Sequence, residues 1–125
     1  MSDPSLKGTR ILVVEDEYFL AQELVRMLVD EGATVVGPVA LVSDALVLID
    51  KEPSLDAAVL DINLGGDWSY PVAESLERRG IPFLFSTGYN ESDLPSGWQH
   101  VRRVEKGMDD HLLVAGLGNI LKIRA

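Results

Sequence analysis

The sequence has no cysteine, few basic residues and no long apolar run. Without cysteine, the chain has no disulfide framework, no thiolate metal site and no cysteine nucleophile. The apolar runs are too short to span a bilayer, and the N-terminal segment MSDPSLKGTR lacks the apolar region of a signal peptide. The sequence therefore predicts a cytoplasmic protein with no membrane partner.

Acidic residues predominate: 20 Asp and Glu stand against 11 Lys and Arg, which gives a formal net charge of −9. Because binding to phosphate backbones requires a concentrated basic surface, this balance argues against nucleic acid as a direct partner. The acidity favours solubility, and some of the acids could be clustered to hold a divalent cation. With 46% hydrophobic and 25% charged residues, the 125-residue chain has the composition and length of one globular domain.

Strand and helix patterns alternate along the chain, as is typical of a parallel sheet covered by helices on both faces. The predicted strands are residues 10–14, 33–37, 57–61, 81–86 and 100–105. The predicted helices are residues 17–30, 43–51, 71–79 and 109–125, with Ser43 as the N-cap of the second.

Pro95 and Gly97 leave room for only a short or irregular fourth helix within residues 88–100. The pattern predicts an α/β fold, a doubly wound five-stranded parallel sheet of flavodoxin-like order 2-1-3-4-5. We expect one domain over residues 1–125, in which residues 1–8 form a flexible N-terminal extension.

Chemically active side chains follow four of the five predicted strands. They are Glu15 and Asp16 after the first strand, Asp61 at the end of the third, Thr87 after the fourth and Lys106 after the fifth. In a doubly wound sheet the carboxyl ends of the strands form the functional crevice, so these side chains should converge. Taken singly, each has an ordinary explanation as a helix-terminal acid, a turn residue or a solvated lysine. The set is specific because all its members fall at one edge.

Carboxylates brought this close repel one another, so they stay ionised only with a cation between them. Mg²⁺ (or Mn²⁺) suits such a site, because it accepts one or two carboxylates and completes its shell with water and phosphate oxygens. Glu15, Asp16 and Asp61, with a backbone carbonyl near Asn63, would hold the metal. Asp61 would then act as nucleophile toward a phosphoryl group whose oxygens pair with Lys106 and accept from the Thr87 hydroxyl.

Four segments resemble those of a response-regulator receiver domain, the phosphate-accepting part of a two-component system. They are ILVVEDE (11–17), AVLDINL (58–64), FSTGY (85–89) and the lysine of RRVEKG (102–107). The resemblance covers nearly the whole chain. It implies that Asp61 accepts a phosphoryl group from the phosphohistidine of a sensor histidine kinase, that Glu15 and Asp16 bind Mg²⁺, and that Thr87 and Lys106 contact the acyl phosphate.

FSTGY also resembles a receiver subfamily marked by Phe-Ala-Thr-Gly followed by an aromatic residue or glycine, with Ser86 here in place of alanine. Members are commonly single-domain, so the resemblance implies a stand-alone response regulator that takes part in its own phosphorylation and dephosphorylation and is otherwise not an enzyme. Its output would be a contact with another protein, onward phosphotransfer through a histidine phosphotransfer protein, or drainage of phosphate from a kinase.

Two positions depart from the usual receiver pattern. Gly107 follows the lysine where most receivers have a cis-proline, and Arg103 occupies the position of the usual aromatic switch residue. Tyr89 is the substitute that the sequence offers for that switch. We also expect Trp98, in the weakly patterned segment, to change its order or exposure on phosphorylation, unless it only packs over the sheet edge.

Tyr18 and Phe19 are candidates for the contact with the kinase, although Phe19 could equally belong to the core. Two other classes of function stay open. One is a receiver-like interaction module that acts without phosphorylation, and the other is an aspartyl-phosphate hydrolase, which would need an acid where the chain has Asn63. A flavodoxin-like nucleotide binder is disfavoured, because no glycine-rich phosphate loop follows the first strand.

Overall fold

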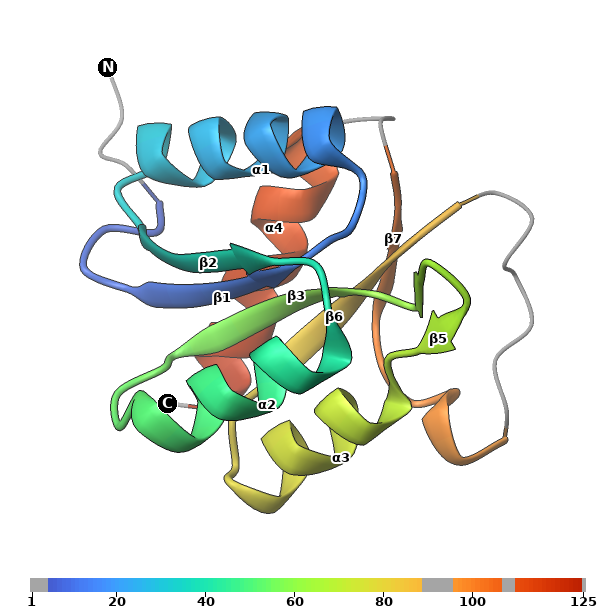
Figure 1. Ribbon diagram of the computed structural model, residues 1–125. Helices are drawn as coiled ribbons and strands as arrows, with labels where there is room; N and C mark the ends of the chain where they lie inside the picture. Colours follow the sequence, from blue (N-terminus) through green and yellow to red (C-terminus); the bar gives the residue numbers. More distant parts are fainter. Residues whose placement is uncertain (1–4, 89–95, 107–109, 125) are drawn as a thin grey trace.

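The computed structural model describes residues 5–88, 96–106 and 110–124 (Figure 1). Its main sheet has five parallel strands in the order β2-β1-β3-β6-β7. These strands are β1 Arg10–Val14, β2 Thr34–Val39, β3 Ala57–Asp61, β6 Phe83–Thr87 and β7 Arg103–Glu105. The predicted order is confirmed, since these are the first to fifth strands of the main sheet in chain order.

In the described part of the chain, four α-helices cover the two faces of the sheet (Figure 1). α1 (Tyr18–Asp30) and α4 (Asp110–Arg124) pack on one face, and α2 (Val42–Lys51) and α3 (Tyr70–Arg78) pack on the other. Within β1, Leu12 and Val14 belong to the core under α2 and α3, whereas Ile11 and Val13 belong to the core under α1 and α4. The unbroken apolar run of this strand is thus explained by burial on both sides.

The helix ends agree with the sequence except at α2. Glu17 is the N-cap of α1 and accepts a hydrogen bond from the Leu20 amide at 2.8 Å. The prediction that Ser43 caps the second helix is wrong, because α2 already begins at Val42 and its N-cap, Leu41, makes no side-chain capping bond.

The loop after β3 contains a two-stranded antiparallel hairpin that the sequence pattern did not predict. β4 (Asn63–Leu64) pairs with β5 (Asp67–Trp68) across Gly65 and Gly66, which have φ of 63° and 102°. Two successive residues with positive φ define the tight turn that favours glycine. This hairpin directs the chain from the end of β3 into α3 (Figure 1).

The N-terminal segment is more ordered than the sequence suggested. Leu6 is fully buried under α1 and α4, and its amide donates to the Glu31 carbonyl at 2.9 Å. The prediction of a flexible extension is therefore wrong for residues 5–8, while residues 1–4 lie outside the described part of the chain.

Between β6 and β7, the described residues form only a short 3₁₀ helix, η1 (Ser96–Trp98). This agrees with the expected lack of a regular fourth helix as far as the description reaches, because residues 89–95 lie outside it. β7 starts at Arg103 rather than at residue 100, and its alternating exposure is that of an edge strand.

Candidate functional site

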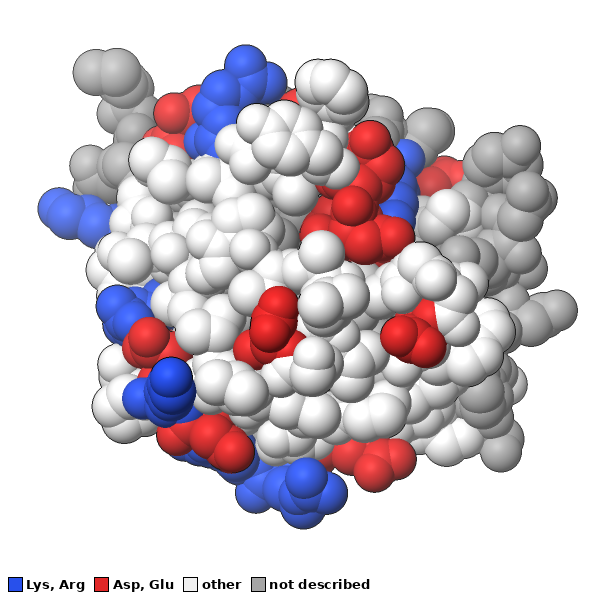
Figure 2. All heavy atoms as spheres, in the orientation of Figure 1, with Lys and Arg blue, Asp and Glu red and all other residues white. Residues whose placement is uncertain are grey.

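The carboxyl edge of the sheet gathers three carboxylates. Oxygen atoms of Glu15, Asp16 and Asp61 all lie within 4.8 Å of one another. Glu15 and Asp61 are only 6% and 2% exposed, whereas Asp16 is exposed. Figure 2 shows acidic side chains gathered beside the N-terminal end of α1, which follows β1. The predicted convergence of the strand ends is thus present in the structure.

Asp61 is buried because of its place in the sheet. It is the last residue of β3, in which all five residues are buried, and it lies opposite Ser86 of β6 in the strand register. Its Oδ1 accepts a hydrogen bond from the Asn63 amide at 3.3 Å. Glu15 is held in a similar way, since its Oε2 accepts from the Glu17 amide at 3.0 Å.

Lys106 supplies the ammonium group that faces these carboxylates. Its Nζ lies 2.7 Å from Asp61 Oδ2 and 3.1 Å from Glu15 Oε1. The backbone positions it, because the Lys106 amide donates to the Thr87 carbonyl at 2.7 Å and so ties the residue after β7 to the end of β6. Thr87 itself is buried, at 7% exposure. All four of these residues therefore lie at the same edge.

The electrostatics of the cluster favour a bound cation. Burial raises the pKa of Asp61 to about 7, and the negative charge of Glu15 adds to this, although Lys106 opposes it. Burial alone would lower the pKa of Lys106, but its hydrogen bond to Asp61 and the charges of both carboxylates outweigh burial and raise it. Among the described residues, the Lys106 ammonium group contacts two of the three carboxylates, Glu15 and Asp61, so negative charge is left over.

The donor set fits a hard divalent ion. Three carboxylate oxygens within bridging distance of one another, two of them from buried residues, are the ligands that Mg²⁺ prefers. Asn63 directs its side chain into the hairpin, where Oδ1 accepts from the Gly66 amide at 2.7 Å. This amide side chain does not supply the acid that an aspartyl-phosphate hydrolase would need at residue 63. The role of the Asn63 backbone carbonyl as a metal ligand stays a prediction.

Trp98 lies in a stack of rings on the α3 side of the sheet. Its ring is parallel to that of Tyr70 at 5.8 Å, and Tyr70 in turn stacks on Trp68 at 6.0 Å. Trp98 also stacks on His100 at 6.3 Å, and it meets Phe85 edge to face. This stack was not predicted, because its rings come from η1, β6, the hairpin and α3, which only the fold brings together.

The other switch candidates are less informative. Tyr89 and Gly107 lie outside the described residues. Arg103 is exposed on β7, opposite Phe85 in the register, and its role as a switch residue stays a prediction. How phosphorylation acts on Trp98 and its neighbours stays a prediction.

Tyr18 and Phe19 are exposed next to the acidic cluster. They are 67% and 74% exposed, and their rings meet edge to face at 5.5 Å. The alternative that Phe19 belongs to the core is therefore wrong. Both side chains are available to another protein that approaches the edge of the sheet.

Comparison with known proteins agrees with the fold. No protein-family model matches the chain. The solution structure of SdrG from Sphingomonas melonis Fr1 is 37% identical, with a TM-score of 0.77 over 99% of this chain and 98% of that one. A BeF₃-activated conformation of SdrG from Pseudomonas melonis Fr1 is 34% identical, with a TM-score of 0.74 over 96% and 99%.

Two further proteins are similar. The crystal structure of a response regulator receiver protein from Sinorhizobium medicae WSM419 has a TM-score of 0.80 over 96% of this chain and 99% of that one, at 20% identity. The Bacillus subtilis (strain 168) protein YbdJ, described as an uncharacterized transcriptional regulatory protein, is 31% identical over 90 residues, which are 70% of this chain and 39% of YbdJ. The matched part thus spans well under half of that relative.

The fold, the carboxylate and lysine cluster and these similarities define the class: the chain belongs to the response-regulator receiver domains. Within the described residues, no helix is long and apolar enough to cross a membrane.

Proposed function

We propose that this receiver accepts a phosphoryl group on Asp61 from the phosphohistidine of a sensor histidine kinase, in the cytoplasm. The observation that carries the proposal is the place of Asp61, buried at the end of β3 and bonded to Lys106 beside Glu15. The P–N bond of the phosphohistidine breaks as an Asp61 carboxylate oxygen forms the new P–O bond, and the imidazole, whose other ring nitrogen carries a proton, leaves as the neutral base.

Mg²⁺ or Mn²⁺, when held by Glu15, Asp16, Asp61 and the Asn63 carbonyl, supplies positive charge for the carboxylates and the transferred oxygens. Lys106 exchanges its contact with the Asp61 carboxylate for a phosphoryl oxygen, so its charge stays paired. The Thr87 hydroxyl donates to another phosphoryl oxygen. The chain's own contribution is therefore to position and neutralise, as phosphoryl transfer requires.

The proposal is supported by the BeF₃-activated form of SdrG, which is similar over almost its whole length. The exposed pair Tyr18 and Phe19 beside the cluster suits a contact with the kinase or with a histidine phosphotransfer protein. The output is then a protein contact or onward phosphotransfer, and the protein acts as a phosphate acceptor rather than as an enzyme on an external substrate.

The experiment is phosphorylation followed by intact mass. With Mg²⁺ and acetyl phosphate, or with a phosphorylated histidine kinase as donor, the wild type should gain one phosphate mass. Asp61→Asn and EDTA should both abolish the gain, whereas Asp67→Asn, which removes an exposed carboxylate from the nearby hairpin, should retain it. If neither donor gave a mass gain, the receiver would be an interaction module that acts without phosphorylation.

A further inference from the structure

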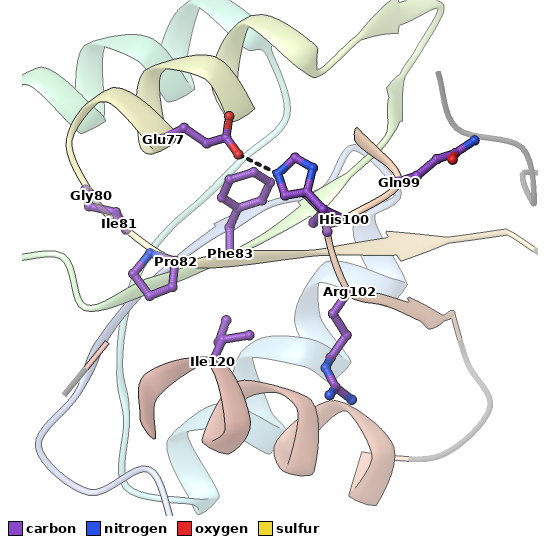
Figure 3. Close-up of a pocket in the computed structure, with 10 residues that line it drawn as sticks. Glu77, Gly80, Ile81, Pro82, Phe83, Gln99, His100, Arg102 and Ile120 are labelled. Atoms are coloured by element: carbon purple, nitrogen blue, oxygen red, sulfur yellow. Dashed lines mark hydrogen bonds and ion pairs between the residues drawn. The ribbon is translucent and has the colours of Figure 1, made fainter. Parts of the chain in front are cut away.

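We propose that a hollow at the amino ends of β6 and β7 binds a small molecule that has an apolar body and one carboxylate. This amino-end pocket is lined by Glu77, Ile81, Phe83, His100, Arg102 and Ile120 among others, and has a volume of about 840 Å³ (Figure 3). That volume lies within the range of small-molecule sites. The proposal does not depend on phosphorylation, because the pocket lies at the end of the strands opposite to Asp61.

The pocket exists because β7 is shorter than its neighbour. β6 begins at Phe83, but its pairing with β7 starts only at Phe85, which lies opposite Arg103. Residues 99–102 approach along a different path, joined to β6 by the Phe85 amide, which donates to the Arg102 carbonyl at 2.9 Å. On the side away from β3, β6 is therefore left without a neighbouring strand near Phe83 in the described part of the chain.

Apolar side chains from separate elements form the walls. Ile81 and Phe83 are 6% and 7% exposed, and half-buried Ile120 points from α4 toward them (Figure 3). A ligand with an apolar body would remove the remaining surface of these side chains from water, which is the main source of affinity in such sites.

The charges at the rim favour an anion. Glu77 is already paired, since its Oε2 lies 2.9 Å from His100 Nε2. Within the described residues, by contrast, no hydrogen bond or ion pair engages the Arg102 side chain, and its stem lies along α4 with Cδ 3.3 Å from the position of a Cβ on Gly116. An exposed guanidinium beside an apolar hollow is suited to bidentate binding of a carboxylate.

The test uses 4-phenylbutyrate as probe and its neutral amide, 4-phenylbutanamide, as matched control, with binding followed by amide NMR shifts of the full chain. The acid should shift the amides of Ile81, Phe83, Val101 and Arg102. Arg102→Gln should weaken its binding about tenfold, the effect of losing one charged hydrogen-bonded contact. Lys122→Gln removes an exposed charge of α4 that lies outside the pocket. This substitution should change the affinity for the acid less than twofold.

The amide should bind about tenfold more weakly than the acid and should not respond to Arg102→Gln. The proposal is overturned if millimolar acid leaves these amides unshifted, if the shifts fall at the Asp61 edge instead, or if acid and amide bind the wild type equally well.

Discussion

Replacing Asp61 with asparagine should stabilise the metal-free protein at pH 8. Burial raises the pKa of this carboxyl from 3.8 to about 7 in the folded protein. Between these two values the folded state holds a proton that the unfolded state has already lost, so stability falls as the pH rises through that window. Above pH 7 the destabilisation is complete, because the carboxylate is then buried in ionised form beside Glu15.

The size of the effect follows from the two pKa values. A change from 3.8 to about 7 corresponds to a ceiling of ~4 kcal/mol. The contact with Lys106 is already included in this pKa, and solvent screening at the open rim reduces the expected gain to about 1–2 kcal/mol.

Urea unfolding in EDTA measures this gain. At pH 8 Asp61→Asn should be more stable than the wild type by about 1–2 kcal/mol, and at pH 5 the difference should be less than half as large. Mg²⁺ should raise the stability of the wild type at pH 8 more than that of the variant. Asp67→Asn, with the same change of charge on an exposed residue, should show neither effect. If Asp61→Asn were less stable than the wild type at pH 8, or if Asp67→Asn gained as much stability, the ionised Asp61 carboxylate would not be the source of the destabilisation.

Three further predictions concern the core, the lysine and the ring stack. Gly118→Ala in α4 should raise the free energy of unfolding by about 0.5–1 kcal/mol, because among the described residues no atom outside the adjoining residues and the helix's own backbone lies within 4 Å of its Cβ position. Gly116→Ala should gain less stability than Gly118→Ala, or lose stability, because its Cβ would lie 3.2 Å from Cδ2 of fully buried Leu84. Urea unfolding of the two variants measures this difference. Lys106→Gln should lower stability at pH 8 by about 1–3 kcal/mol in EDTA, since two buried carboxylates lose their ammonium group, and unchanged stability would contradict this. In a variant whose other tryptophan is replaced by phenylalanine, phosphorylation should change the emission of Trp98; no change would mean that this residue only packs.

The order of the main sheet could be predicted because four of its strands are apolar runs and the last, β7, alternates as an edge strand does. The hairpin after β3 could not, since its strands have two residues each and are too short to show alternation. Only the pair Gly65 and Gly66 signalled its turn. The burial of Leu6 was missed for a different reason, because a single apolar residue in a polar segment has no period and its partners lie far away in the sequence.

The convergence of Asp61, Glu15 and Lys106 was predictable from topology alone, because the carboxyl ends of parallel strands share one edge. The surroundings of Trp98 were not, since they depend on rings from α3, β6 and the hairpin that only the folded chain brings together. The amino-end pocket was equally hidden, because it arises from the offset between the starts of β6 and β7.

The most direct test of the central claim is to locate the phosphoryl group. After reaction with a phosphorylated histidine kinase and Mg²⁺, borohydride reduction converts an aspartyl phosphate to homoserine, which peptide mass spectrometry can assign to a residue. We predict homoserine at residue 61. Homoserine at another aspartate, or phosphate found on a hydroxyl or histidine side chain instead, would contradict it.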